Sequence, residues 1–461
     1  MDAPACPGCR ELAAEVERLR EEVRRLTALV RRNSSNSSLP PSANPPGAVA
    51  PVKKPKSGRR PGGQPGHPPH LKQVLPLERV TRVVPIVPER CAHCDAALPA
   101  QAGPNDPEPT RHQVAELPPV RAEVVEYQGH ARRCRRCGTI TSAPIPEAIR
   151  QYSIGSGLAG AMAYFAGCHQ VSKRGVEEIV ETLFEVPVAL GTISNLEQEM
   201  SEALASCHAA AIEAVQAAPV KHVDETGWKK RGQKCWLWVA ATAQLSVFVL
   251  HARRGLLGLT MLLGETIQGI VVSDRWSAYQ RLPVYRRQLC WAHLQRDFQA
   301  LVDLGGKAKP FGQQLLAFTE DVFHWWSRIR DGTMTRGTLQ TYIHEQRPWL
   351  REVLQRGCAS GCAKTAGLCG HLLDLEPALW TFVRHEGVEP TNNRAERALR
   401  KGVLWRKKAF GCVSDGGCRF VERILTVVQT LRQQGRPVWQ FLRDALQAHR
   451  SGQAPPALLN G

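Results

Sequence analysis

The sequence predicts a multidomain α/β protein, and three observations lead to this class. Two runs of apolar and β-branched residues, 218–224 and 269–274, each end in an aspartate, as strands do when they deliver an acid to the edge of a sheet. Longer stretches at 151–217 and 300–388 instead show the patterns of helices. The chain of 461 residues is long enough for two or three domains. We therefore expect a sheet core that is interrupted by a helical insertion.

The charge balance predicts a polyanionic partner. The chain has 60 Lys and Arg against 42 Asp and Glu, a formal charge of +18, which favours phosphate neutralisation and counterion release. Nucleic acid is therefore preferred over the alternative of a basic protein that is merely soluble. Residues 1–10 lack the apolar segment of a signal peptide, and the longest apolar run, 157–168, is too short to cross a bilayer. We expect a cytoplasmic, nucleoid-associated protein with no membrane partner, whose 15 cysteines are metal ligands or reduced thiols.

Residues 1–32 predict a coiled-coil helix. Apolar residues recur at steps of four and three, with Glu and Arg between them: Leu12, Val16, Leu19, Val23, Leu26 and Val30. This seam favours self-association, with packing on the rest of the chain as the alternative. Residues 33–70 predict a basic linker rich in Pro, Gly and Ser, which cannot bury a core. Cys6 and Cys9 form a further pair, and a single pair is weak support for a metal site.

Residues 71–150 predict a small zinc-binding β module. Segments 80–87 and 120–127 have strand-like patterns, and two Cys-x-x-Cys knuckles supply four ligands, Cys91, Cys94, Cys134 and Cys137. Four thiolates suit a tetrahedral structural Zn²⁺, which would hold together a domain too small to be stable by its core alone. Four arginines surround the second knuckle and direct the module toward phosphates: Arg132, Arg133, Arg135 and Arg136.

The region 151–217 predicts helices separated by short turns. A helix-turn-helix that binds DNA fits this pattern, and a packing subdomain of the core fits it about equally well.

Residues 218–299 predict the first part of an RNase H-like core. Strands are expected at 218–224, 235–242, 245–251, 270–274 and 287–290, with a helix at 255–265 between the third and the fourth. A three-stranded meander, a crossover helix and a further strand are the order of that fold. Helices at 311–330, 339–355 and 372–383 predict the insertion, 300–388. Its tryptophans are more simply explained as core residues than as a surface that stacks on DNA ends. Residues 389–461 then complete the core with two further helices.

Three carboxylates are the candidate catalytic residues: Asp224, Asp274 and Glu396. Converging acids can hold two Mg²⁺ or Mn²⁺ ions, which drive in-line displacement at a phosphodiester. The alternative for Glu396 is a surface ion pair with Arg400, four residues later on the same helix.

A cationic and amide-rich stretch around Glu396 predicts phosphate contacts. Its members are Asn392, Asn393, Arg394, Arg397, Arg400, Lys401, Arg406, Lys407 and Lys408. His293 and Asp297 lie one helical turn apart and are candidate auxiliary groups; a capped helix start with a buried histidine is the alternative.

Several motifs together resemble those of bacterial insertion-sequence transposases of the sixty-six type. They are Asp224-Glu-Thr-Gly-Trp228, Trp236-Leu-Trp-Val239, Ser273-Asp-Arg-Trp-Ser-Ala-Tyr279, Cys290-Trp-Ala-His-Leu-Gln-Arg-Asp297 and Asn392-Asn-Arg-Ala-Glu-Arg-Ala-Leu-Arg400. The amino-terminal heptads, the linker and the paired knuckles share the likeness, which therefore covers nearly the whole chain.

The resemblance implies a DDE transposase whose triad is Asp224, Asp274 and Glu396. Enzymes of this family cut and join DNA at the terminal inverted repeats of their element. Expected partners are double-stranded DNA, a second copy of the chain or a higher oligomer, and helper proteins of the same element. The alternatives are a structure-specific nuclease of the same fold and a catalytically inactive zinc-containing DNA-binding protein.

Overall fold

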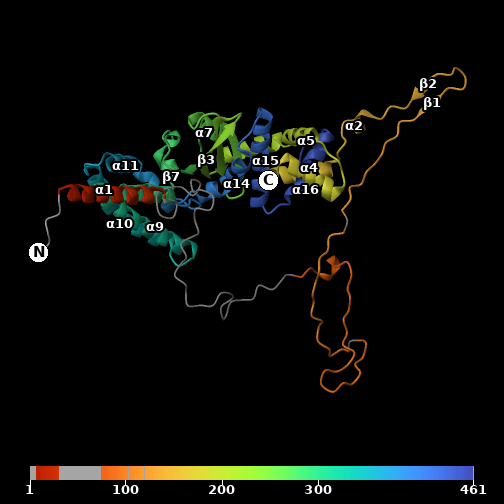
Figure 1. The fold of residues 1–461 in the computed structure, drawn as a ribbon, viewed down its shortest axis with the longest axis horizontal. Coiled ribbons are helices and arrows are strands. Elements are labelled where there is room, and N and C mark those ends of the chain that lie inside the picture. The colour runs from red at the N-terminus through yellow and green to blue at the C-terminus, as the bar shows by residue number, and fades with distance from the viewer. Residues whose placement is uncertain (1–6, 31–73, 102, 119, 460–461) are drawn as a thin grey trace. The chain divides into compact units, whose positions relative to one another are not determined.

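The computed structural model describes residues 7–30, 74–101, 103–118 and 120–459 (Figure 1). The predicted linker at 33–70 and Cys6 lie outside these residues. The chain divides into two compact units, Val52–Arg121 and the remainder. The remainder contains a five-stranded sheet with helices around it, which confirms the predicted mixed α/β class. Among the described residues, no helix is long and apolar enough to span a membrane.

The sheet has the strand order β5-β4-β3-β6-β7. Strands β3, β4 and β5 form an antiparallel meander, whereas β6 runs parallel to β3 and β7 runs parallel to β6. Helix α7 (Leu256–Leu263) connects the meander to β6. Four strands lie where the sequence predicts them, β4 Gln233–Ala241, β5 Ser246–His251, β6 Ile270–Ser273 and β7 Arg287–Leu289, and β3, Val220–Lys230, overlaps its predicted range.

Strand β3 is longer than the sequence analysis predicts. The prediction that the strand ends at Asp224 is wrong, because β3 continues to Lys230 and pairs with β4 along that length. The continuation alternates in burial: Trp228 is 1% exposed, whereas Lys229 is exposed. Pairing with β4 therefore extends β3 beyond the aspartate at which the sequence pattern suggests an end. Asp224 lies in the middle of the strand.

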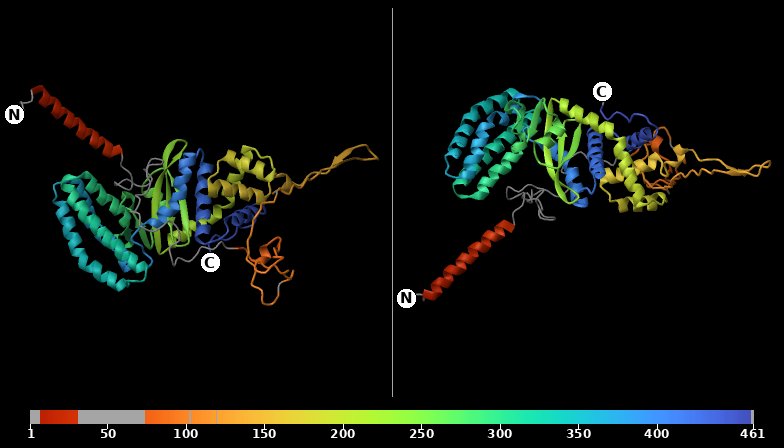
Figure 2. Two further views of the ribbon diagram at one scale, coloured as in Figure 1. Left: turned by 60° about the horizontal axis from the view of Figure 1, so that its bottom comes forward. Right: turned by 90° about the horizontal axis from the view of Figure 1, so that it is seen from above.

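The two faces of the sheet pack against different helices. On one face, Val223, Trp238 and Val249 belong to a core shared with helices α3 to α6 and α16. On the other face, Leu237 and Val239 pack against α14 and α15. In both views of Figure 2 the sheet, with α14 and α15, lies between the insertion and the group α3 to α6. These helices are α3 Ser156–Ala163, α4 Lys173–Phe184, α5 Leu190–Ala203, α6 Ala205–Ala217, α14 Asn393–Ala409, α15 Asp415–Gln433 and α16 Val438–Arg450, and a π-helical turn, Tyr164–Cys168, continues α3.

The edge strand β5 is covered by side chains of α15. Glu422, Thr426 and Thr430 lie at four-residue spacing on that helix and accept the backbone N–H groups of Leu250, Phe248 and Ser246, at 2.6, 3.0 and 3.2 Å. An uncovered edge would present these donors to other chains. The C-terminal part of the core thus covers the edge of the sheet with residues that lie 172 to 184 positions after the donors they accept from.

The predicted helical insertion is present. It packs on β6 and β7 through a core that includes Val272, Leu289 and Phe318. Trp380 is 1% exposed, and Trp325 and Trp326 pack on the same core, which agrees with the interpretation of these three tryptophans as core residues. The fourth, Trp349, is 38% exposed. The helices are α8 Trp291–Leu304, α9 Lys309–Arg330, α10 Arg336–Cys358, α11 Ala363–Asp374, α12 Glu376–Leu379 and α13 Thr381–Arg384.

The region before the core has less regular structure than predicted. The strands expected at 80–87 and 120–127 are wrong: residues 80–87 and the described residues of 120–127 have no strand, and Ile86 and Val124 are 95% and 82% exposed. Strand propensity without a pairing partner does not form a ladder. The regular elements in the described part of this region are a 3-10 turn (Leu77–Arg79), a hairpin of β1 (Ala131–Arg133) with β2 (Ile140–Ser142), and the short helix α2 (Glu147–Arg150). The predicted heptads form one helix, α1 (Pro7–Val30).

Candidate active site

A cavity of about 1020 Å³ opens beside the centre of the sheet. Its walls are strongly charged: the acidic lining residues are Asp224, Glu225, Asp274, Asp297 and Glu396, and the basic ones are Arg254, Arg275, Arg296, Arg400, Arg406 and Lys407. His293, Trp236 and Trp276 line it too. All three carboxylates that the sequence singles out therefore share one cavity, although 172 residues separate the first from the last.

Strand pairing brings the two aspartates together. The parallel register of β3 and β6 matches His222 with Val272, and continuing it by two residues places Asp224 beside Asp274. Asp274 directly follows the end of β6, as predicted. Its Oδ1 accepts the backbone N–H of Trp276 at 2.8 Å, which fixes the turn after the strand. Asp224 therefore projects from the central strand of the sheet, and Asp274 from the turn after the neighbouring strand.

Glu396 reaches the cavity from the first turn of α14. Asn392, which is fully buried, precedes this helix and donates its side-chain amide to the carbonyl of Val223 at 2.7 Å, one residue before Asp224. The backbone N–H of Asn392 donates to the Cys290 sulfur at 3.1 Å. Because these contacts hold the start of α14 against β3 and α8, the position of Glu396 follows from the packing of three elements.

The electrostatic surroundings of Asp224 are unfavourable for its charge. Burial raises the pKa of this carboxyl well above its usual range, and Glu225, Asp274 and Glu396 raise it further. Its Oδ1 accepts the backbone N–H of Glu225 at 2.9 Å. Among the described residues, no basic side chain forms an ion pair with it. Arg254 and Arg296 approach the neighbouring acids instead, at 3.9 Å from Asp274 and 3.8 Å from Glu396. A carboxylate among other acids and without an ion-pair partner of its own is in an environment in which a divalent ion would be stabilised.

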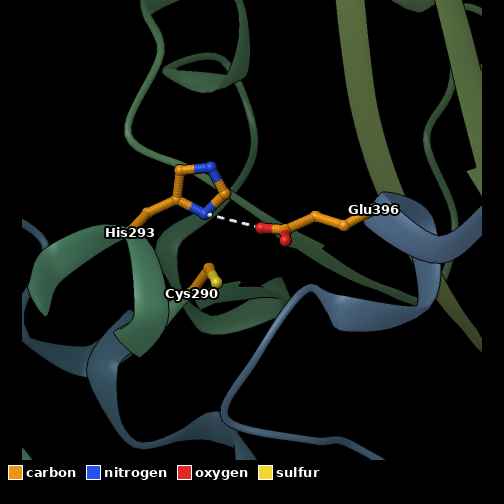
Figure 3. Close-up of side chains that lie close together, drawn as sticks. All are labelled: Cys290, His293 and Glu396. Atoms are coloured by element: carbon orange, nitrogen blue, oxygen red, sulfur yellow. Dashed lines mark ion pairs between the residues drawn. The ribbon is translucent and has the colours of Figure 1, made fainter. Parts of the chain in front are cut away.

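His293 lies across from Glu396, as Figure 3 shows. Its Nδ1 is 3.6 Å from Glu396 Oε1, too long for a hydrogen bond, and both atoms are buried without a hydrogen-bond partner. Burial lowers the pKa of His293 to about 4, and Arg296 lowers it too. The other predicted auxiliary residue, Asp297, accepts a hydrogen bond from Arg275 Nε at 2.8 Å. The two auxiliary candidates are thus both at the cavity, in different contacts.

Sequence reasoning missed a network around Glu225, whose members Arg254, Trp236 and Trp276 line the same cavity. Glu225 accepts hydrogen bonds from Arg254 Nε at 2.7 Å and from the Tyr279 hydroxyl at 2.6 Å. The Arg254 guanidinium lies 3.8 Å from the ring centroid of Trp276 and 4.9 Å from that of Trp236. Strand alternation indicates that Glu225 faces away from Asp224, but nothing in the sequence pairs it with Arg254.

The predicted cationic stretch divides into two groups on α14. Arg394 donates to Glu389 and Thr242, and Arg406 donates to Thr226 and Gly227 on β3, so both hold the helix in place; Lys401 is partly buried. The exposed members are Asn393, Arg397, Arg400, Lys407 and Lys408, of which Arg400 and Lys407 line the cavity.

The two cysteine pairs occupy turns of the same kind. In each pair, the backbone N–H of the first cysteine donates to the carbonyl of the residue five positions later in the chain. The carbonyl of the same cysteine accepts the N–H of the residue four positions later. That fourth residue has a positive φ, 58° at Asp95 and 73° at Gly138. Cys91 and Cys94 lie in the smaller compact unit and Cys134 and Cys137 in the larger. Arg132, Arg133, Arg135 and Arg136 are exposed on the β1–β2 hairpin.

Comparisons with known proteins found two family matches and one curated relative. The family described as "Transposase IS66 family" matches residues 155–419, and a family of unknown function matches residues 6–73. A curated relative from Sinorhizobium fredii, an uncharacterized protein called y4qI, is 27% identical over 199 residues, which are 39% of this chain and 35% of that protein. The chain thus spans about a third of the length of this relative. The transposase match covers more than half of the chain and includes the sheet and all three cavity carboxylates, and the chain therefore belongs to the IS66 family of transposases.

Proposed function

We propose that this transposase is a DDE enzyme with an RNase H-like core, which cleaves and joins DNA at the terminal inverted repeats of an insertion sequence. The observation that carries the proposal is the meeting of Asp224, Asp274 and Glu396 at one cavity, from the middle of a strand, the end of a strand and the start of a helix. The strand order β5-β4-β3-β6-β7, with three antiparallel strands and two parallel ones, supports the RNase H-like assignment.

The residues present fit hard divalent cations. Three carboxylates supply the oxygen ligands that Mg²⁺ and Mn²⁺ prefer, and the repulsion that raises the pKa of Asp224 is the kind that a cation relieves. Asp224, between the other two acids, would contact both ions, and Asp274 and Glu396 would each hold mainly one. Bound Mg²⁺ or Mn²⁺ would supply charge neutralisation at the phosphodiester and a more nucleophilic water or DNA 3′-OH.

The basic side chains around the acids would position the DNA backbone. Arg400 and Lys407 line the cavity on exposed positions of α14, and Arg397 and Lys408 are exposed on the same helix. Cations beside a carboxylate cluster attract phosphates toward it without reading sequence. The net charge of +18 supports double-stranded DNA as the partner.

The cysteine pairs would hold a structural Zn²⁺. Both pairs sit in turns with backbone N–H groups near the sulfur atoms, and hydrogen bonds lower the pKa values of two thiols: His93 and Cys94 act on Cys91, and Thr139 lowers that of Cys137 to about 7. Such surroundings favour the thiolate that zinc requires. Purified protein should contain about one zinc per chain, and Cys91→Ser should remove it; a metal-free preparation would contradict the assignment.

Self-association through α1 is the expected route to an oligomer. Leu12, Val23 and Val30 are 68%, 61% and 85% exposed on this helix, and burial of an apolar seam against a second copy would stabilise both helices. Action on two DNA ends calls for at least a dimer, and helper proteins of the element are further expected partners.

The test is Mg²⁺- or Mn²⁺-dependent cleavage and joining by the purified protein on duplexes that end in the inverted repeats flanking its gene. Joined products from wild type that are absent for Glu396→Gln establish the transposase and its triad together. Cleavage without joining would instead identify a structure-specific nuclease. Binding without cleavage by either protein would identify a catalytically inactive DNA-binding protein.

A further inference from the structure

We propose that Cys290, His293 and Glu396 form a binding site for a soft divalent cation of the zinc class, which shares Glu396 with the proposed hard-metal site. Within the described residues, these three form the one group of at least three potential ligands whose donor atoms all lie within 4.8 Å of one another. Figure 3 shows the three side chains converging from the start of α8 and the start of α14. The predicted triad does not form such a group, although its members share the cavity.

The distance between the histidine and glutamate donor atoms fits tetrahedral coordination, and the cysteine sulfur lies within 4.8 Å of both ligands. Zinc bonds of about 2.0–2.3 Å to nitrogen, oxygen and sulfur place neighbouring ligand atoms about 3.3–3.8 Å apart. The separation of 3.6 Å between His293 Nδ1 and Glu396 Oε1 falls within this range. Both atoms are buried and lack hydrogen-bond partners. A buried donor or acceptor without a partner costs free energy, and a cation between the two atoms would remove that cost for both.

The ligand types select the class of cation. A thiolate and an imidazole are soft or intermediate ligands that suit zinc, whereas Mg²⁺ prefers oxygen alone. Cys290 and His293 are three positions apart at the start of α8, so the helix itself fixes their spacing. The Cys290 sulfur accepts the N–H of Asn392 at 3.1 Å, and burial raises the pKa of its thiol to about 12. On metal binding the thiol proton would leave to solvent and the sulfur electron pair would form the new bond.

The cavity provides the entry path and the fourth ligand. His293 and Glu396 line it, whereas Cys290 lies behind them at 1% exposure. A water from the cavity would complete the tetrahedron. Arg296 approaches Glu396 Oε1 at 3.8 Å, and this loose contact would be displaced when the cation binds.

The shared ligand gives the site a regulatory consequence, which rests on the proposed function of Glu396. A carboxylate held by zinc beside His293 is withdrawn from Asp224 and Asp274, so the hard-metal site loses one of its three acids. Zinc at this position would therefore inhibit Mg²⁺-dependent cleavage by competing for Glu396.

Cobalt(II) is a suitable probe of the full-length protein, because Co²⁺ replaces zinc and absorbs in the near ultraviolet when a thiolate binds it. Bound Co²⁺ per chain and this absorption are measured for wild type, Cys290→Ser and His293→Asn. The matched control is Cys369→Ser, which also changes a fully buried cysteine but lies on α11, away from the cluster. Thermal unfolding of each variant checks that it is folded.

We expect wild type and Cys369→Ser to bind one more Co²⁺ per chain than the two cluster variants, with a matching loss of thiolate absorption in Cys290→Ser. Equal Co²⁺ content in all folded variants would overturn the site, whether or not the protein cleaves DNA. In a second measurement, micromolar Zn²⁺ should slow Mg²⁺-dependent cleavage by wild type at least about tenfold, which is about 1.4 kcal/mol, and slow His293→Asn far less relative to its own rate without zinc. Cobalt binding without zinc inhibition would overturn the competition for Glu396.

Discussion

Two acids, Glu376 in the helical insertion and the partly buried Asp224 in the sheet, have opposite surroundings. Glu376 is 6% exposed and receives three hydrogen bonds of 2.8 Å, two from Arg347 and one from the Trp380 indole. Asp224 receives a single backbone N–H and is surrounded by other acids. The first carboxylate has all the partners that a buried charge requires. The second has an unmet electrostatic requirement, which is typical of a functional site.

This contrast distinguishes structural from functional acids by their partners rather than by their burial. A fully paired acid stabilises the fold and has little capacity left for a ligand. An acid held among other acids by backbone packing destabilises the isolated protein, and binding of a cation recovers the loss. The predictions that follow test this distinction, beginning with the largest expected effect.

Asp224→Asn should reduce the rate of Mg²⁺-dependent cleavage at least about 1000-fold, while DNA binding is retained or improved. The raised pKa of Asp224 means that its charge opposes folding above the ordinary carboxyl range. Removal of the charge should therefore increase the free energy of unfolding near pH 7.5 in the absence of metal, by about 1 kcal/mol. Cleavage assays, filter binding and urea unfolding measure the three quantities. Loss of binding and of stability together would show that Asp224 has a folding role instead.

Glu376→Ala should do the reverse. It removes the partner of Arg347, whose side chain is 35% exposed, and it leaves the buried Trp380 indole without its acceptor. The loss of these hydrogen bonds to a charged group costs about 3 kcal/mol. Urea unfolding measures this loss, and cleavage per folded molecule below the unfolding transition should stay within about twofold of wild type. A selective loss of activity at full stability would contradict the comparison.

Glu422 is an intermediate case that sharpens the distinction. It accepts the N–H of Leu250 at the sheet edge, and burial raises its pKa from 4.5 to about 7. Because the folded pKa exceeds the unfolded one, its contribution to stability is full below pH 4.5 and is lost as the pH rises through 7. Wild type should therefore lose about 3 kcal/mol relative to Glu422→Gln between pH 4.5 and 8. If the free energies of unfolding of wild type and Glu422→Gln differ by the same amount at every pH in this range, the pKa of Glu422 is not raised by folding.

Arg400→Ala tests the basic side of the same cavity and should have the smallest effect. An exposed cation that contacts one phosphate contributes about one unit to the slope of log affinity against log salt. We expect weaker DNA binding at low salt and a slope smaller by about 1, with unfolding unchanged. Arg330→Ala, an exposed arginine at the end of α9, is the matched control and should leave the slope unchanged.

The sheet and its two aspartates were predictable because each signal is local. Runs such as 269–274 combine β-branched residues with a terminal acid, and strand pairing then determines their neighbours. The role of Glu396 could not be predicted from a local pattern. It is the one acid among the seven basic residues of α14, and only the resemblance to known transposases distinguishes it from the partner of a surface ion pair with Arg400. Local propensity also failed at 80–87, where apolar residues have no strand to pair with.

The Arg254 network could not be predicted, because it depends on contacts across the fold. Arg254 meets Glu225 from 29 positions away and stacks on Trp276 from 22 positions away. The pairing of His293 with Glu396 likewise requires the start of α8 to lie against the start of α14. The sequence placed His293 near the site but did not indicate its partner.

The covering of strand β5 by α15 has a consequence for synthesis on the ribosome. The chain leaves the ribosome from its amino terminus, so Ser246, Phe248 and Leu250 emerge well before Thr430, Thr426 and Glu422, which accept their N–H groups. Until α15 has emerged, the nascent sheet presents an open edge that can pair with another chain. Products that stop short of residue 415 should therefore aggregate, and only chains completed through this helix should yield soluble transposase.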